Sequence, residues 1–374
     1  MKVDKKTWKK VKLGEVCNLY QPATISTKCL SATGKYLVYG ANGIIGRYDE
    51  YNHESPEVLI TCRGATCGSI NISEPFSWIN GNAMVVHPKV ETLFDFQFLA
   101  YLASAIDYSK VITGAAQPQI TRTNLEKVVI WIPSIEDQKG IASELIALKT
   151  IINGYKAQIM DLDELIESVF NKTFGDISIN DMNWEVIPMG KLGNLKNGLN
   201  YEKGEKGKVL KFIGVGDFQN NKYLSSSDIL STIELESISE EYLLKDEDIV
   251  FVRSNGNKNL VGRCLEVFPN NTEITYSGFC IRFRKTADII NKYLLGVLTD
   301  STYKKTHILN SNGIGIQNIN QKLLSNLPIP IPPIELQKKY ENQVNSIYTQ
   351  KTLISEQLRD AEQLMAERMQ YYFS

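Results

Sequence analysis

The clearest candidates for chemistry in this 374-residue chain are side chains that can hydrogen-bond to the edges of bases. Arg and Lys bind guanine, and Asn and Gln bind adenine, through paired hydrogen bonds in the major groove. The segment VRSNGNKNLVGR (residues 252–263) concentrates five such side chains around a glycine: Arg253, Asn255, Asn257, Lys258 and Asn259. Its counterpart in the first half of the chain is CRGATCG (residues 62–68), which carries Arg63. Both segments follow β-branched runs, so these side chains are expected at the ends of strands.

Two Gly-containing loops offer a similar mixture of amide, hydroxyl and basic side chains, which suits contacts to bases and to phosphates. The candidates in the first loop are Gln117, Gln119, Thr121 and Arg122. Those in the second loop are Asn312, Gln317, Asn318 and Asn320. Three lysines at the ends of the preceding predicted helices suit phosphate contacts: Lys110, Lys304 and Lys305. Solvated turns have the same composition, so residue types alone leave both interpretations open.

Residues suited to catalysis are sparse. The three histidines lie in unrelated contexts, which argues against a catalytic triad or a zinc site. The fragment FIGVGDF (residues 212–218) has a methyltransferase-like pattern, but the Asn/Asp-Pro-Pro-Tyr/Phe partner motif is absent from the sequence. The sequence also has no phosphate-binding G-x-x-x-x-G-K-[ST] motif. Glu57 and Asp248 could bind a nuclease metal, but both precede strands, where solvated acids are common. Binding without catalysis is favoured.

The elements that must position these residues occur twice, so the chain is a tandem repeat. Towards the end of each copy, an offset of 199 places Gly114 on Gly313, Gln119 on Asn318, Pro133 on Pro332 and Gln138 on Gln337. At the beginnings, an offset of 176 matches WKKVKLGEV to WEVIPMGKL, with Trp8 on Trp184 and Gly14 on Gly190. The difference of 23 residues must be extra sequence inside the second copy.

Each copy is expected to fold as a strand-rich α/β unit. The β-branched runs at 55–64 and 246–256 predict strands, and apolar spacing with a period of 3.6 predicts helices over 94–112 and 291–308. Short Pro-bracketed strands follow, KVVIWIP and SNLPIPIP, and each leads into a long helix.

The long helices carry the strongest periodic signal. Apolar residues with alternating spacings of four and three predict a coiled-coil seam in the first: Ile141, Leu145, Leu148, Ile152, Tyr155, Ile159, Leu162, Ile166 and Val169. The second has the same register, with Lys351 as its one polar position: Tyr340, Val344, Ile347, Lys351, Ile354, Leu358, Ala361 and Met365. Two equivalent helices in one chain pair most simply with each other, antiparallel. Two ordinary amphipathic helices, each packed on its own domain, are the alternative.

Composition limits the class of protein. Hydrophobic residues make up 43% and charged residues 22% of the chain, as in soluble globular proteins. No secretory signal or membrane-spanning run is recognisable, and the six scattered cysteines indicate reduced thiols, so a cytoplasmic location is expected. The net charge is -1. Six lysines lie within residues 1–12, and a solvated tail and a set of phosphate contacts explain this run equally well.

This plan resembles the specificity (S) subunit of type I restriction–modification systems. The similarity extends over nearly the whole chain. It rests on the start motifs WKKVKLGEV and WEVIPMGKL, on EVLITCRG and DIVFVRSNG, and on IPSIEDQKGIASEL and IPPIELQKKYENQV. The expected fold is α+β, with two strand-rich target-recognition domains in pseudo-two-fold tandem and two long helices in an antiparallel coiled coil. The expected boundaries are 1–133 and 176–332 for the domains, and 134–175 and 333–374 for the helices.

The resemblance implies a non-catalytic subunit that recognises double-stranded DNA. Each domain would bind one half of a bipartite, asymmetric target, and the helices would set the spacer. The implied partners are DNA methyltransferase (modification) subunits, two of them expected, and a restriction (motor nuclease) subunit. Exposed helix residues, including Glu144, Lys156, Glu356 and Arg359, would be available for docking the methyltransferase subunits, and simple solvated helix faces are the alternative. No cofactor is expected on this chain; S-adenosylmethionine, ATP and Mg²⁺ would act on the partners. A stand-alone methyltransferase or nuclease, or a structural interaction protein, are the alternatives.

Overall fold

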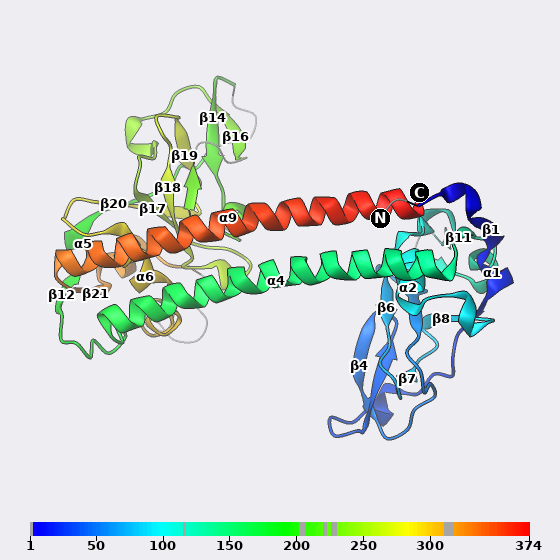
Figure 1. Cartoon of the computed structure of the whole chain (residues 1–374). Coiled ribbons are helices and arrows are strands. Elements are labelled where there is room, and N and C mark those ends of the chain that lie inside the picture. Colours follow the sequence, from blue (N-terminus) through cyan, green and yellow to red (C-terminus); the bar gives the residue numbers. More distant parts are fainter. Residues whose placement is uncertain (1–2, 115–116, 202–205, 220–222, 226–229, 310–317) are drawn as a thin grey trace. The chain divides into compact units, whose positions relative to one another are not determined.

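The computed structural model describes residues 3–114, 117–201, 206–219, 223–225, 230–309 and 318–374 (Figure 1). The chain divides into two compact units, each considered by itself. Unit 1 comprises Met1–Ala157 with Ser355–Ser374, and unit 2 comprises Gln158–Ile354. Each unit includes part of both long helices, α4 (Ile135–Phe174) and α9 (Ile334–Phe373), which have 40 residues each.

Unit 1 is built on small sheets. Its four-stranded sheet has the order β2 (Cys17–Tyr20), β8 (Ala83–Pro88), β5 (Val58–Thr61) and β6 (Ile70–Ile72). A three-stranded sheet has the order β4 (Gly43–Tyr48), β3 (Tyr36–Gly40) and β7 (Trp78–Ile79). Two strand pairs complete it: β1 (Lys9–Lys12) with β11 (Val129–Ile132), and β9 (Ile112–Thr113) with β10 (Gln119–Ile120). The start motif therefore pairs with the Pro-bracketed strand.

Unit 2 repeats this topology. Its larger sheet has the order β13 (Gly193–Asn197), β20 (Cys280–Lys285), β17 (Asp248–Val252), β18 (Cys264–Phe268) and β15 (Tyr223–Ser225). The order β16 (Ser231–Leu235), β14 (Lys208–Ile213) and β19 (Ile274–Tyr276) matches the three-stranded sheet of unit 1, and β12 (Glu185–Pro188) pairs with β21 (Pro328–Ile331). Residues 214–230 join β14 to β16, whereas only Ala41 and Asn42 join β3 to β4. Much of the extra sequence expected in the second copy therefore lies here, where β15 extends the sheet.

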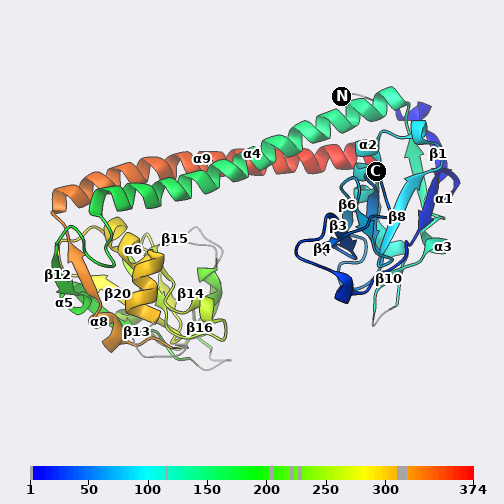
Figure 2. The ribbon, with the colours of Figure 1, turned by 90° about the horizontal axis from the view of Figure 1, so that it is seen from below.

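Short helices lie at matching points of both units (Figure 2). Those of unit 1 are α1 (Leu13–Val16), α2 (Phe96–Ala105) and α3 (Arg122–Leu125), with the 3₁₀ turns η1 (Lys5–Thr7), η2 (Thr27–Cys29), η3 (Glu91–Leu93) and η4 (Tyr108–Lys110). Those of unit 2 are α5 (Met189–Leu192), α6 (Asn291–Thr299), α7 (Ser301–Tyr303) and α8 (Gln321–Ser325), with η5 (Val215–Phe218), η6 (Glu240–Tyr242), η7 (Lys258–Leu260) and the π-helical η8 (Lys304–Leu309).

The helices predicted over 94–112 and 291–308 are shorter than expected. The side chain of Asp107 accepts a hydrogen bond from the N–H of Ser109, and that of Asp300 accepts one from the N–H of Tyr303. Each aspartate therefore caps a new turn, η4 or α7, just beyond the end of α2 or α6. An apolar period continues across such a break, so the pattern alone could not locate it.

The matching segments IPSIEDQ (residues 132–138) and IPPIELQ (residues 331–337) share Pro, Ile, an acidic residue and Gln in this order, and we call them the Pro-Ile-acid-Gln motif. Its Gln joins each long helix to its unit. Gln138 is 1% exposed; its Oε1 accepts from the N–H of Asp95 (2.9 Å), and its Nε2 donates to the carbonyls of Leu93 (3.0 Å) and Pro133 (3.1 Å). Gln337 makes the equivalent contacts, accepting from the N–H of Ile290 (3.0 Å) and donating to a proline carbonyl (2.8 Å). The motif thus binds the amino-terminal end of α2 or α6.

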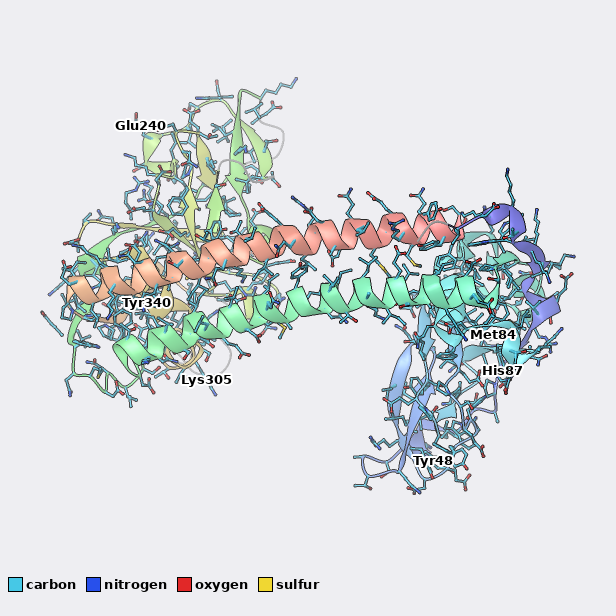
Figure 3. The ribbon with its side chains drawn as sticks, in the orientation of Figure 1. Tyr48, Met84, His87, Glu240, Lys305 and Tyr340 are labelled. Carbon is cyan, nitrogen blue, oxygen red and sulfur yellow. The ribbon has the colours of Figure 1, made fainter. Side chains whose placement is uncertain are left out.

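Within each unit, α4 and α9 pair antiparallel, as predicted. In unit 1, Glu144 binds Arg368 (2.9 Å) and Lys156 binds Glu362 (2.7 Å), so residue numbers fall along α9 as they rise along α4. In unit 2, Asp163 binds Lys351 (2.6 Å). Further along, Tyr340 packs on Phe170 and Phe174 of α4, with ring centroids 5.5 and 5.2 Å apart (Figure 3). The predicted seam residues of both helices are buried or half-buried.

These pairs revise the assignment of the outer helix faces. Glu144 also accepts a hydrogen bond from the hydroxyl of Tyr372 (2.8 Å) and is half-buried, so its assignment to an exposed outer face was wrong. Lys156 is exposed, as expected, but it also pairs with α9 through Glu362. Glu356 and Arg359 are exposed, as expected.

Candidate nucleic-acid interface

In unit 1, two segments that are far apart in the sequence lie side by side at the end of β5. Arg63 and Gln119 form an antiparallel bridge. The N–H of Gly64 donates to the carbonyl of Pro118 (3.0 Å), and the N–H of Ile120 donates to the carbonyl of Cys62 (3.0 Å). The strand-end segment and the first polar loop therefore form one edge.

The turn between β7 and β8 contributes a third segment to the edge. The N–H of Cys62 donates to the carbonyl of Asn82 (3.4 Å), and the side chain of Asn82 is exposed. We call these parts together the three-segment edge of unit 1: residues 62–64, 80–82 and 117–121.

Unit 2 has the same arrangement. Ser254 and Asn318 form the bridge that corresponds to the one between Arg63 and Gln119. The N–H of Ile319 donates to the carbonyl of Arg253 (2.8 Å), whose own N–H donates to the carbonyl of Phe279 (2.7 Å). The three-segment edge of unit 2 therefore comprises residues 253–259, 277–279 and 318–320. Arg253 is structurally equivalent to Cys62, and Ser254 to Arg63.

Some of the predicted site residues have a structural task at this edge. Thr121 caps α3 by accepting from the N–H of Asn124 (3.3 Å), and Asn320 caps α8 by accepting from the N–H of Leu323 (2.8 Å). Arg122 Nε binds Glu126 (2.7 Å) one helical turn away. Of the four candidates in the loop of unit 1, Gln117, Gln119 and Arg122 are exposed, as is Arg63 on the neighbouring segment.

The asparagines of unit 2 shape their own turn. Asn255 Oδ1 accepts from the N–H of Asn257 (2.7 Å), and Asn257 Oδ1 accepts from the N–H of Asn259 (3.1 Å). Their amide nitrogens make no hydrogen bond to the described part of the chain. Asn257, Asn259 and Asn318 are exposed, whereas Arg253 and Asn255 are half-buried. Three other predicted positions lie outside what the structure describes: Asn312, Gln317 and the side chain of Lys258.

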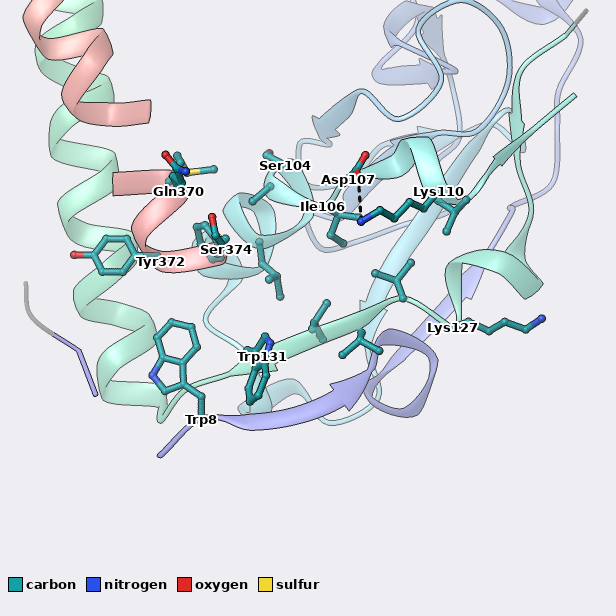
Figure 4. A pocket seen from close by; sticks show the side chains of 18 of the residues that line it. Trp8, Ser104, Ile106, Asp107, Lys110, Lys127, Trp131, Gln370, Tyr372 and Ser374 are labelled. Carbon is teal, nitrogen blue, oxygen red and sulfur yellow. Dashed lines mark ion pairs between the residues drawn. The ribbon is translucent and has the colours of Figure 1, made fainter. Parts of the chain in front are cut away.

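The three predicted phosphate-binding lysines differ in their surroundings. Lys110 is exposed, with its Nζ 3.6 Å from Asp107 (Figure 4). Lys305 is also exposed (Figure 3). Lys304 is half-buried, and burial lowers the pKa of its ammonium group below the ordinary lysine value. Lys110 and Lys305 are therefore better placed for phosphate contacts.

Five of the six N-terminal lysines belong to the described residues: Lys5, Lys6, Lys9, Lys10 and Lys12. Lys9, Lys10 and Lys12 lie on β1, and Lys5 Nζ donates to the carbonyl of Ser374 (2.9 Å) and lies 5.7 Å from the ring centroid of Trp8. A simple solvated tail does not describe this segment.

The two carboxylates considered for catalysis are held in protein interactions. Asp248 is 1% exposed and forms a bidentate ion pair with Arg284 (2.7 and 2.6 Å). Glu57 is 6% exposed and lies 3.0 Å from His87 Nδ1. Burial raises the pKa of Glu57, and the contact with His87 opposes this shift. Within the residues that the structure describes, no group of three or more His, Cys, Asp or Glu side chains could hold a metal ion.

A hollow in unit 1 lies at the carboxyl end of α9 (Figure 4). It has a volume of about 790 Å³, and its lining is largely apolar, with Trp8, Trp131 and Phe373 among the residues. None of the lining residues belongs to the three-segment edge.

The described helices include none that is long and apolar enough to cross a bilayer.

Comparison with known proteins identifies the class to which this fold belongs. The family model for the type I restriction modification DNA specificity domain matches residues 5–161 and 182–361, so the chain belongs to this family. The two matches correspond to the two copies of the sequence repeat. The resemblance inferred from the motifs is confirmed.

Individual relatives are distant. The StySPI specificity subunit of Salmonella potsdam is 25% identical over 271 residues, which cover 68% of this chain and 58% of that protein. The chain therefore matches less than two thirds of that relative's length. A putative specificity subunit of Haemophilus influenzae is 24% identical over 96% of this chain and 92% of its own length.

Solved structures support the fold. The type I S subunit from M. genitalium has a TM-score of 0.63 at 15% identity, with 100% of this chain and 98% of that chain covered. A second structure, from a study of complex assembly in the type I system, has a TM-score of 0.60, also at 15% identity. The predicted α+β fold with long helices is confirmed.

Proposed function

We propose that this chain is the DNA-specificity subunit of a type I restriction–modification complex. Each unit binds one half of a bipartite, asymmetric double-stranded target through its three-segment edge. The chain itself carries out no catalysis. It binds no cofactor; S-adenosylmethionine, ATP and Mg²⁺ act on the partner subunits.

The observation that carries this proposal is the repeated edge, considered together with the family. Both units build an edge from three adjoining segments fixed by the same backbone bonds. Exposed amide or guanidinium side chains lie on all three segments in unit 1 and on two of the three in unit 2. The residues at equivalent positions differ, such as Arg63 against Ser254 and Gln119 against Asn318. Because side chains at base edges determine sequence preference, two such edges favour two different half-sites.

The long helices support a fixed spacer. Forty continuous helical residues extend about 60 Å, at about 1.5 Å per residue. Ion pairs and ring contacts hold α4 against α9 within both units. We therefore assign the spacing of the half-sites to the paired helices.

The proposed partners are two methyltransferase subunits and a restriction subunit. Exposed helix positions, including Glu356 and Arg359, offer surfaces for docking. Partner subunits that contact DNA would supply part of the electrostatic affinity, which fits the chain's net charge of -1. A DNA ligand and six free cysteines favour the cytoplasm as the site of action.

The test uses the complex reconstituted with its methyltransferase subunits and the target found by sequencing methylated DNA. Gln119→Ala should weaken binding about 5- to 150-fold through one half-site, and Asn318→Ala should do so through the other, as expected for loss of a base contact. Gln350→Ala on an exposed position of α9 is the matched control. If both variants weaken binding equally to every DNA sequence, or if neither variant weakens binding, these edges do not recognise bases.

A further inference from the structure

The turn between β19 and β20 carries an exposed aromatic ring on the three-segment edge of unit 2. Phe279 is 62% exposed. Its backbone is fixed, because its N–H donates to Ser277 Oγ (3.2 Å) and its carbonyl accepts from the N–H of Arg253 (2.7 Å). The ring is therefore held at a defined place on the edge while most of its surface faces solvent.

Unit 1 has a polar side chain at the equivalent position. The carbonyl of Asn82 accepts from the N–H of Cys62, as the carbonyl of Phe279 accepts from the N–H of Arg253. Both residues are exposed, so neither side chain is needed to fill a core. The two units thus present an amide and an aromatic ring from the same backbone position.

Phe279 borders an open hollow of about 560 Å³. Phe212, Tyr201 and Val215 give it apolar walls, and the Tyr201 and Phe212 rings meet edge to face with centroids 5.1 Å apart. Ser254 and Asn255, from the strand-end segment of the same edge, also line it. Apolar surface therefore lies directly beside groups that can hydrogen-bond to a base.

The chemistry of DNA limits what this surface can recognise. Phosphates and sugars offer polar groups to a protein, whereas the thymine 5-methyl group is the apolar feature of the major groove and is contacted by residues such as Phe. We propose that Phe279 contacts the 5-methyl group of a thymine in the half-site bound by unit 2. This inference rests on the proposed function and adds a specificity determinant to it.

The test replaces thymine by deoxyuridine, which removes only the methyl group. In the reconstituted complex, one such replacement in the half-site of unit 2 should weaken binding by the wild type about fourfold, the value expected for one buried methyl group. Phe279→Ala should weaken binding to the thymine duplex by at least as much and should show no further loss with deoxyuridine. Phe279→Leu, which keeps an apolar side chain, should retain part of the sensitivity.

The half-site of unit 1 provides the internal control, because the Phe279→Ala complex should respond to replacements there as the wild type does. The inference is overturned if the half-site of unit 2 contains no thymine on either strand, or if Phe279→Ala keeps the wild-type response at every thymine. The inference is also overturned if Phe279→Ala weakens binding by the same factor on the thymine duplex and on the deoxyuridine duplex, each compared with wild type on that duplex. Such a result would indicate a ring wedged between bases. Failure of the wild-type complex to bind any specific sequence would contradict the proposed function itself.

Discussion

Replacing Gln138 by Met tests why the Pro-Ile-acid-Gln motif occurs twice. Met has a similar length and similar helix propensity, but it cannot take part in the three hydrogen bonds that Gln138 makes. The change leaves the N–H of Asp95 and the carbonyls of Leu93 and Pro133 without this partner. The expected result is a loss of stability in unit 1 with little change in packing.

The magnitude follows from the three bonds. Each hydrogen bond contributes about 1 kcal/mol net, and a group left buried without a partner costs about 1–3 kcal/mol. Asp95 and Leu93 are only half-buried, so water can compensate in part. We expect the free energy of unfolding to fall by about 2–4 kcal/mol, and the Tm of unit 1 by about 6–12 °C. Gln337→Met removes two bonds rather than three and should cost about two thirds as much in unit 2.

Calorimetry measures the stability, and hydrogen exchange locates the effect. In the Gln138→Met variant the amide of Asp95 should exchange faster, whereas that of Ile290 should keep its wild-type rate; Gln337→Met should reverse this pattern. Gln350→Met, at an exposed helix position, is the matched control and should change stability by less than about 0.5 kcal/mol. If Gln138→Met behaves like this control in both assays, the motif does not act through these hydrogen bonds.

Three further predictions concern the helices and a buried carboxyl group. Gly154→Ala should stabilise the chain by about 1 kcal/mol in urea unfolding, because Ala favours a helix more than Gly does and the new Cβ would meet no atom of another element. Gly296→Ala should destabilise the chain, because its Cβ would collide with Phe170. Effects of the same sign would contradict this reasoning. Because burial raises the pKa of Glu57, the neutral carboxyl group stabilises the folded state, and this contribution is lost as the pH rises through the raised pKa. Glu57→Gln should therefore gain stability relative to wild type as the pH rises above the ordinary glutamate pKa of 4.5. A pH-independent difference would refute this. Deleting one heptad from each of α4 and α9, in register, should shorten the preferred spacer by about 10 Å, or roughly three base pairs, without changing either half-site. An unchanged spacer in the methylated motif would refute the role of helix length.

Local patterns in the sequence predicted several elements well. The seam from Ile141 to Val169 predicted the inner face of α4, because the spacing of apolar side chains directly reflects helical geometry. The buried β-branched runs predicted β5 and β17 for a similar reason. The repeat also predicted two units of the same topology, because equivalent sequences form equivalent pairings.

The edge was only partly predictable because it depends on which distant segments become neighbours. Arg63 and Gln119 were selected from their types, but their bridge arises from long-range pairing. Asn82 and Phe279 were missed because a short turn between two strands carries no motif of its own. The only sequence feature that could have indicated them is that corresponding turns of the two copies carry different side chains, Asn82 and Phe279. Likewise, burial of Lys304 depends on packing that composition does not reveal.

Recognition of one half-site by each unit can be measured by sequencing methylated DNA from a host that carries this chain with its methyltransferase partners. We expect one bipartite motif with two unlike half-sites and a spacer of fixed length. A substitution on the edge of either unit should change only the corresponding half-site. A continuous motif, a palindromic motif, or a substitution in one unit that changes both halves would contradict recognition of one half-site by each unit.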